Sequence, residues 1–306
     1  MELTSLVINQ VFIMFLLIAT GYLCNKLNLI SAQTNKSLSG LVLNLISPAL
    51  IISSYQIEFK TELLHGLIIS FLLAAASMLL SVVLGQVLIR GKQKDDAAIE
   101  RFVVVYSNCG FMGIPLVNSI YGAEGVFYVT AYITVFNLLV WTHGVMLMKG
   151  ELNLKGVLAV FKAPAIIATI LGIILFVARI SLPGGILSAI NYIGSMNTPM
   201  AMIVAGATIA QTKIGKALLK PRIYYTSAIR LLLVPAATLV LFKALPVNST
   251  IILTVVLTAA CPAGAMVTLF SLNYNKNSLY ASEIFAVSTL LSAFTLPLIV
   301  FVSGMI

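Results

Sequence analysis

Residues 106–116 read YSNCGFMGIPL and lie inside a long apolar run. Between Asn108 and Pro115 the stretch holds an asparagine, two glycines and a proline, and each of these residue types weakens an α-helix. In lipid, an interrupted helix leaves backbone groups without partners, which is tolerated only where protein or a water-filled cavity supplies them. We therefore expect a helix to be interrupted here, at a functional site.

The composition is that of an integral membrane protein. Of the 306 residues, 60% are hydrophobic and 9% are charged, and the mean hydropathy is +1.08, whereas a soluble domain has about 25% charged residues. The net charge of +9 comes from basic residues scattered between apolar runs, which favours contacts with lipid headgroups over nucleic acid. The three cysteines show no disulfide or metal-binding spacing, and we expect no cofactor.

The apolar runs predict an all-α membrane protein with ten transmembrane helices. A helix needs about 20 apolar residues to cross the hydrocarbon, and charges and turn residues separate ten such runs. The predicted spans are 5–24, 36–55, 63–89, 101–120, 124–147, 156–178, 185–210, 222–243, 248–271 and 279–304. The longest polar stretch, 90–101, is a short loop, so we expect no soluble domain.

The distribution of basic residues predicts the orientation. The connections after the odd-numbered spans, with their flanks, hold fourteen of the eighteen Lys and Arg residues. The other side holds only Lys60, Arg179 and Lys243, and Arg230 lies within a span. Because cytoplasmic loops carry the excess of Lys and Arg, we expect a multi-pass protein of the cell membrane with both termini outside the cytoplasm.

The prolines indicate an internal repeat. Two pairs match at about half the length of the chain: Pro48 with Pro199, 151 residues apart, and Pro115 with Pro262, 147 residues apart. We expect residues 1–150 and 151–306 to be two copies of a five-helix unit. Since five is odd, the second copy is inverted in the membrane, and inverted repeats with matching interrupted helices are typical of secondary transporters.

The two interruptions, in the fourth and ninth helices, predict an anion site. Proline lacks an N–H and crowds the carbonyl four residues earlier, so Pro115 frees that of Phe111 and Pro262 that of Thr258. Breaks that meet near the midplane would gather helix N-termini and free N–H groups, which suit an anion. The candidate substrate-binding residues are Asn108, Cys109, Gly110, Gly113, Pro115, Cys261, Pro262, Ala263 and Gly264.

Four further polar residues are candidates for lining the cavity. Asn44, Ser47 and Asn197 lie close to prolines and either face the cavity or repair the backbone at a kink. Arg230 either draws organic anions inward or extends to the cytoplasmic surface. The nine acidic residues all fall in loops or near span ends. The absence of a carboxylate clearly placed at the midplane favours an anionic substrate.

At these residues the chain resembles the auxin efflux carrier family, which includes plant PIN carriers and bacterial carriers of malonate, malate and other organic acids. The motif NCGFMGIPL at 108–116 is similar to the family signature N-x-x-x-M-G-I-P-L. The similarity continues through PMAMIVAG (199–206), AIRLLLVPA (228–236) and CPAGAMVTLFSLNYN (261–275).

The resemblance implies ten helices, a scaffold part and a transport part, and helices 4 and 9 crossing at the substrate site. It also implies an elevator-like motion and a homodimer. By this resemblance Asn108 faces the substrate carboxylate, and Pro115 and Pro262 are the prolines of the crossing. Plant carriers have Pro-Gln-Gly where this chain has Pro262-Ala263-Gly264, and their long cytoplasmic loop is replaced by the short connection 148–155, so a small carboxylate is expected rather than auxin.

The sequence therefore predicts a secondary transporter of a small organic anion that works by alternating access. The alternatives are a sodium-coupled symporter of the bile-acid type, which needs clustered acidic and amide ligands on the broken helices, and an anion channel or facilitator. An intramembrane enzyme needs a nucleophile with a base, or paired carboxylates, at membrane depth. The predicted spans contain no such constellation, so we expect no enzymatic activity.

Overall fold

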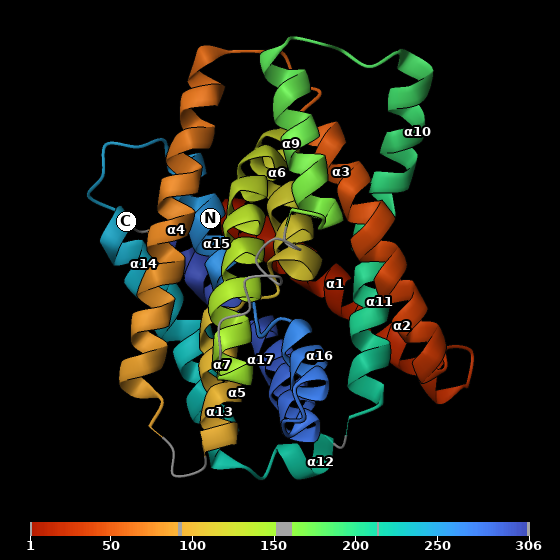
Figure 1. The fold of residues 1–306 in the computed structure, drawn as a ribbon, viewed down its shortest axis with the longest axis vertical. Coiled ribbons are helices and arrows are strands. Elements are labelled where there is room, and N and C mark those ends of the chain that lie inside the picture. The colour runs from red at the N-terminus through yellow and green to blue at the C-terminus, as the bar shows by residue number, and fades with distance from the viewer. Residues whose placement is uncertain (1, 91–93, 151–160, 213, 305–306) are drawn as a thin grey trace.

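The computed structural model describes residues 2–90, 94–150, 161–212 and 214–304, and these residues form helices without a strand (Figure 1). Four segments, labelled η, are π-helical turns. The elements up to residue 150 are α1 (Glu2–Lys26), α2 (Ala32–Leu41), η1 (Val42–Ile46), α3 (Ser47–Ser54), α4 (Thr61–Leu88), α5 (Lys94–Val105), η2 (Cys109–Gly113), α6 (Ile114–Leu139), η3 (Val140–Gly144) and α7 (Val145–Lys149).

The remaining elements follow from residue 164. They are α9 (Pro164–Val177), α10 (Gly184–Ser195), α11 (Asn197–Ala210), α12 (Ile214–Ala217), α13 (Pro221–Ala228), η4 (Ile229–Leu233), α14 (Val234–Phe242), α15 (Ser249–Ala260), α16 (Met266–Asn273) and α17 (Ser278–Ser303). Part of the predicted span 156–178 and most of the connection 148–155 lie outside the described residues.

Among the described residues, seven helical runs are long and apolar enough to cross a membrane. The run Cys109–Lys149 is 41 residues long, and it turns at Gly122, whose φ of 59° and ψ of −147° are not helical. The apolar helices Pro164–Val177 and Ser249–Ala260 are shorter. The protein is therefore a multi-pass membrane protein, while the ten-span inverted repeat stays a prediction.

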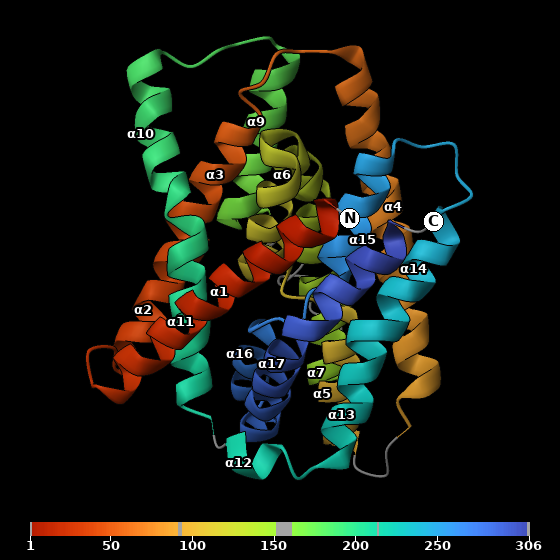
Figure 2. The ribbon, with the colours of Figure 1, turned by 180° about the vertical axis from the view of Figure 1, so that it is seen from behind.

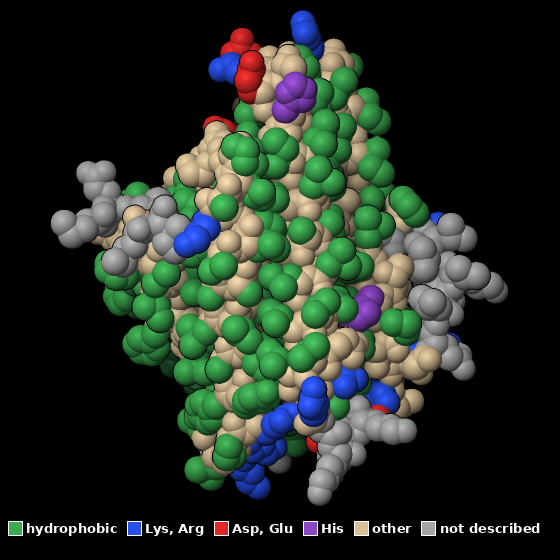
Figure 3. All heavy atoms as spheres, turned by 90° about the vertical axis from the view of Figure 1, so that its left-hand side faces the viewer, with side chains coloured by type: hydrophobic (Ala, Val, Ile, Leu, Met, Phe, Trp, Pro, Cys, Tyr) green, Lys and Arg blue, Asp and Glu red, His purple; other side chains and the backbone are tan. Residues whose placement is uncertain are grey.

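The outer surface is apolar and suits a lipid environment. Along α4, the side chains of Ile68, Leu72, Leu79 and Val83 are between 52% and 65% exposed. Figure 3 shows a broad hydrophobic face, with a cluster of Lys and Arg side chains at its lower end and a few others at its upper end and on the left. A helix that exposes large apolar residues in this way is stable in hydrocarbon and would be poorly solvated by water.

Glycines allow α1 and α11 to pack with their backbones in close contact. A Cβ atom on Gly21 would lie 2.1 Å from the carbonyl oxygen of Ile203, and one on Gly206 would lie 1.9 Å from that of Ile18. Small residues at helix contacts are the usual means of close packing in membranes, where lipid offers no hydrophobic drive for association. This contact fixes α11 against the N-terminal helix.

Three prolines are accommodated by π-helical turns and do not break their helices. In each case the residue before the proline donates its N–H to the carbonyl five residues earlier, which relieves the crowding at the proline ring. The bonds run from Ser47 to Val42 before Pro48, from Ile114 to Cys109 before Pro115, and from Val234 to Ile229 before Pro235.

The interruption of the fourth predicted span therefore does not lie at Pro115. That proline is the second residue of α6, and the non-helical residues are 106–108, about two turns upstream. The π-helical turn η2 absorbs the proline. The interruption falls at Tyr106, Ser107 and Asn108. The residues at the start of the motif therefore indicate its position better than Pro115 does.

The α1–α11 contact can be tested with one added methyl group. Gly206→Ala is expected to lower the midpoint of thermal unfolding in detergent, because its Cβ would overlap a backbone carbonyl that cannot rotate away; overpacking of this kind costs about 1–3 kcal/mol. The matched control is Gly185→Ala in α10, where a Cβ would meet no atom within 4 Å. Equal midpoints for the two variants would contradict the described packing.

Candidate substrate site

Two helices are interrupted at the same level of the molecule. The first is broken at residues 106–108, between α5 and η2, and the second at residues 261–265, between α15 and α16. Figures 1 and 2 show α5 and α16 in the lower half and α6 and α15 in the upper half. The two broken helices thus run in opposite directions, and their interruptions are those that the sequence predicted.

The two breaks contact each other through their backbones. Ser107 and Ala263 form an antiparallel bridge, in which the N–H of Asn108 donates to the carbonyl of Pro262 at 2.8 Å and the N–H of Gly264 donates to the carbonyl of Tyr106 at 3.0 Å. Part of the backbone that the breaks release is therefore used to join them. We call this paired region, residues 106–108 with 261–265, the crossing.

Two side-chain features support the crossing. The hydroxyl of Ser288 in α17 accepts the N–H of Ala263 at 3.2 Å. A Cβ atom on Gly264 would lie only 3.0 Å from the carbonyl oxygen of Ser107 and 3.3 Å from that of Tyr106. Gly264 is therefore required for the close approach of the two backbones.

The cysteines at the crossing fill space between the broken helices. Cys109 and Cys261 are free and buried. A Cβ on Gly113 would lie 3.6 Å from the sulfur of Cys261 and 3.7 Å from the Cβ of Cys109, so all three residues meet here. The thiol of Cys261 donates to the carbonyl of Leu257 at 3.4 Å, as expected for small residues that permit close packing.

Donors at the start of two half-helices have no carbonyl acceptor. Within the described residues, the N–H groups of Cys109, Gly110 and Phe111 have no carbonyl acceptor, and neither do those of Ala265 and Met266. Gly110, Ala265 and Met266 are partly exposed, and a Cβ on Gly110 would meet no atom within 4 Å. The first donors of η2 therefore border open space.

Asn108 adds a side-chain donor at the same place. It precedes the first residue of η2, yet its side chain does not cap that helix. The residue is 5% exposed, and its Nδ2 group has no partner among the described residues. The buried hydroxyl of Tyr132 lies close to Ser107 and Arg230. Each buried, unpaired polar group costs about 1–3 kcal/mol, which a hydrogen-bonding ligand would recover.

Arg230 does not extend to the surface. The residue lies in η4, is fully buried, and donates to backbone carbonyls on both broken helices. Its Nη1 bonds the carbonyls of Val104 at 2.7 Å and Val105 at 3.4 Å, its Nε bonds that of Cys261 at 3.1 Å, and its Nη2 bonds that of Ala259. The snorkelling alternative is therefore wrong.

Of the other candidate cavity residues, two are buried and one is exposed. Ser47 and Asn197 are buried and joined by a hydrogen bond of 2.8 Å from the serine hydroxyl to the amide oxygen, while Nδ2 of Asn197 has no partner among the described residues. Asn44 is exposed. No hydrogen bond among the described residues joins Ser47 or Asn197 to Asn108.

Two carboxylates near the ends of predicted spans are buried and paired. Glu100 accepts from Arg222 at 2.6 Å and from the Tyr280 hydroxyl at 2.8 Å, and Glu283 accepts from Lys220 at 2.5 Å. Neither touches the crossing through a described bond. Among the described residues, no group of three or more His, Cys, Asp or Glu side chains is arranged to hold a metal ion.

Sequence reasoning missed some contacts at the crossing. Tyr106 anchors its break through its hydroxyl, which donates to the carbonyl of Leu139 at 2.8 Å and lies 2.9 Å from Nδ1 of His143. Ser288 and Tyr132 carry no motif that could have singled them out. Tyr106, in contrast, is the first residue of the stretch 106–116, so its position next to the break could have been recognised.

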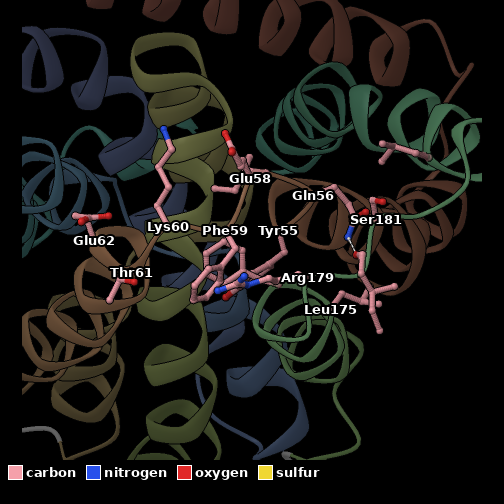
Figure 4. A pocket seen from close by; sticks show the side chains of 14 residues that line it. Tyr55, Gln56, Glu58, Phe59, Lys60, Thr61, Glu62, Leu175, Arg179 and Ser181 are labelled. Atoms are coloured by element: carbon pink, nitrogen blue, oxygen red, sulfur yellow. Dashed lines mark hydrogen bonds between the residues drawn. The ribbon is translucent and has the colours of Figure 1, made fainter.

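A separate cavity of about 590 Å³ lies between the α3–α4 and α9–α10 connections (Figure 4). The Arg179 guanidinium stacks over the Phe59 ring, 4.7 Å from its centroid. The side-chain oxygen of Gln56 accepts the N–H of Leu182 at 2.7 Å, which ties the two connections together. No residue of the crossing lines this cavity.

The sequence profile of the family described as "Membrane transport protein" matches residues 6–300. The chain belongs to this family. It is the auxin efflux carrier family that the NCGFMGIPL motif indicated, and the match runs through both breaks. The protein is therefore a membrane transporter, and families of membrane transporters are in general not enzymes.

Known relatives carry the same general description. The chain is 26% identical over 221 residues to the "Uncharacterized transporter YfdV" of Escherichia coli (strain K12), which covers 69% of each protein. It is 24% identical over 297 residues to an "Uncharacterized transporter" of Methanothermobacter thermautotrophicus, which covers 95% of this chain and 96% of the relative. The similarity therefore extends along almost the whole chain.

Two glycine substitutions distinguish the structural part of the crossing from the open part. Gly264→Ala is expected to lower thermal stability, because its Cβ would press on two backbone carbonyls, with a cost of about 1–3 kcal/mol.

Gly110→Ala is expected to keep stability unchanged or raise it, since alanine favours a helix over glycine by about 1 kcal/mol. It is also expected to lower uptake, because its methyl group fills the space beside the N–H donors. Stability is read from thermal unfolding and uptake from proteoliposomes. The reverse ranking of the two stabilities would contradict this description.

Proposed function

We propose that the protein is a secondary transporter that carries a small organic anion across the cell membrane by alternating access at the crossing. The observation that carries the proposal is the buried, unpartnered Nδ2 group of Asn108 beside the N–H groups of Cys109 and Gly110, which have no carbonyl acceptor. These donors lie at a helix N-terminus next to open space. A carboxylate accepts hydrogen bonds in such a geometry and is stabilised by the positive end of the helix.

The surrounding charges support an anion over a cation. The buried carboxylates nearest in sequence to the crossing, Glu100 and Glu283, are engaged by basic side chains, and Arg230 is the buried cation at the breaks. A sodium-coupled site would need anionic or amide ligands on both broken helices, and the second break offers Ala263 where an amide would serve. Uptake that needs sodium would favour the symporter alternative, and unsaturable flux without counterflow would favour a channel.

The proposal includes the larger arrangement implied by the family resemblance. Residues 1–150 and 151–306 would form inverted five-helix repeats that meet at the crossing, and the part holding the crossing would move relative to a scaffold part in a homodimer. The opposite directions of the two broken helices support an inverted repeat. The basic residues at one end of the molecule support a cytoplasmic lower end, with both termini extracytoplasmic.

Replacement of Asn108 tests the proposed role directly. Asn108→Ala is expected to reduce uptake of the transported carboxylate at least about ten-fold, because a hydrogen bond to a charged group contributes about 1.5–3 kcal/mol. Asn108→Asp keeps the shape and places a negative charge at the site, so it is expected to reduce uptake further. Uptake and counterflow are measured in proteoliposomes with labelled lactate, malonate and malate.

The matched control is Asn137→Ala, which removes a side-chain amide from α6 beyond the turn at Gly122, where it bonds the carbonyl of Ile133 at 2.8 Å. This variant is expected to transport at the wild-type rate. Wild-type uptake by a correctly folded Asn108→Ala protein would remove Asn108 from the site. Failure of the wild-type protein to transport or bind any carboxylate would overturn the proposed function.

A further inference from the structure

Four half-helices end at the crossing, and their dipoles oppose one another. The C-termini of α5 and α15 and the N-termini of η2–α6 and α16 all lie there. A helix C-terminus carries about half a negative elementary charge and an N-terminus about half a positive one. Two ends of each sign cancel, so the backbone alone would make the crossing close to neutral and would favour neither an anion nor a cation.

The bonds of Arg230 to the backbone all go to the negative helix ends. Its carbonyl acceptors belong to Val104 and Val105 in the last turn of α5, to Ala259 in the last turn of α15, and to Cys261 directly after it. The side chain is fully buried. Among the described residues, no acidic side chain forms an ion pair with it. Its positive charge is therefore balanced by helix ends and not by a carboxylate.

We propose that Arg230 determines the charge selectivity of the crossing. It neutralises both helix C-termini, so the two helix N-termini remain uncompensated and give the crossing a net charge of about +1. One carboxylate would complete the balance. The inference rests on the proposed function, since it concerns the same site. Arg230 acts through the helix ends, because four of its hydrogen bonds go to backbone carbonyls there.

The guanidinium also has a geometric role that an ammonium cannot reproduce. Its donors lie in one rigid plane and point in several directions, and here they join carbonyls of two separate broken helices. Arg230 is therefore a positioning residue that holds the ends of α5 and α15 at a fixed separation. Its charge and its geometry can be separated, because lysine keeps the charge and loses the fork, whereas glutamine loses the charge.

Ligands of different charge distinguish an electrostatic role of Arg230 from a purely structural one. Coulomb attraction is proportional to ligand charge, so removal of one positive charge from the site weakens a dianion more than a monoanion. Lactate and malonate have the same number of carbons and carry one and two carboxylates. A general loosening of the crossing would weaken both by a similar factor.

The experiment compares Arg230→Lys, Arg230→Gln and Arg90→Gln with the wild-type protein. Dissociation constants for lactate and malonate are measured by calorimetry on purified protein at pH 7, and uptake of both in proteoliposomes. Arg90 is an exposed arginine just after α4, and its Nε donates to the carbonyl of Val87 at 3.1 Å. Arg90→Gln therefore removes the same charge away from the crossing, and it is expected to bind both anions as the wild type does.

Arg230→Gln is expected to weaken lactate binding at least about ten-fold and malonate binding by a clearly larger factor. Arg230→Lys is expected to keep both dissociation constants within about three-fold of the wild type and to slow uptake, because the fork is lost. Hydrogen exchange at residues 104–110 and 259–265 is expected to rise in both variants.

Equal loss for the two anions in Arg230→Gln, or no loss, would overturn the selectivity role while leaving the proposed function intact. If Arg230→Gln does not fold, Arg230→Lys decides: a folded protein that has lost affinity for both anions contradicts the proposal, and retained affinity with slower uptake supports it. Absence of binding to the wild-type protein overturns the proposed function together with this inference.

Discussion

The requirement that every backbone polar group at membrane depth has a partner dominates this structure. Two helices are interrupted inside an apolar molecule, and each interruption supplies the partners that the other lacks, through the bonds of Asn108 with Pro262 and Gly264 with Tyr106. Arg230 bonds four further carbonyls at the ends of α5 and α15, those of Val104, Val105, Ala259 and Cys261. The first N–H groups of the two half-helices that begin here have no carbonyl acceptor among the described residues, and they are hydrogen-bond donors at helix N-termini. An irregular backbone that would be costly in hydrocarbon thereby becomes a site of defined polarity.

This arrangement links stability to function at single residues. At Gly264 the two backbones approach each other, so a side chain there would disturb the fold. At Gly110 the glycine borders open space, so a side chain there would restrict access to the N–H groups. The buried carboxylates of Glu100 in α5 and Glu283 in α17 pair with Arg222 in α13 and with Lys220 directly before it. Pairing of both carboxylates keeps negative charge away from the free donors. The positive character of the site is therefore a property of several helices together.

Much of this could be predicted from sequence, and the limits have a physical cause. The breaks near Asn108 and Pro262 could be predicted from the sequence, because asparagine, glycine and proline weaken a helix in the turn in which they lie. The break lies within the predicted stretch 106–116 but upstream of Pro115, because a π-helical turn absorbs that proline. The composition of η2 does not reveal whether a helix breaks or forms such a turn at a proline. Arg230 was recognised as unusual, but its acceptors lie about 30 and 126 positions away, and no periodicity encodes contacts at such separations. Ser288 and Tyr132 were missed for the same reason.

The central claim is that the free donors of the crossing bind an anion, and it can be observed without transport. The purified protein, labelled with ¹⁵N at asparagine and glycine, is titrated with malonate and followed by nuclear magnetic resonance. We predict saturable shifts of the Asn108 side-chain amide and the Gly110 N–H, with one dissociation constant for both, while the N–H of Gly185 in α10 does not move. Saturable binding that leaves Asn108 and Gly110 unshifted would contradict the account.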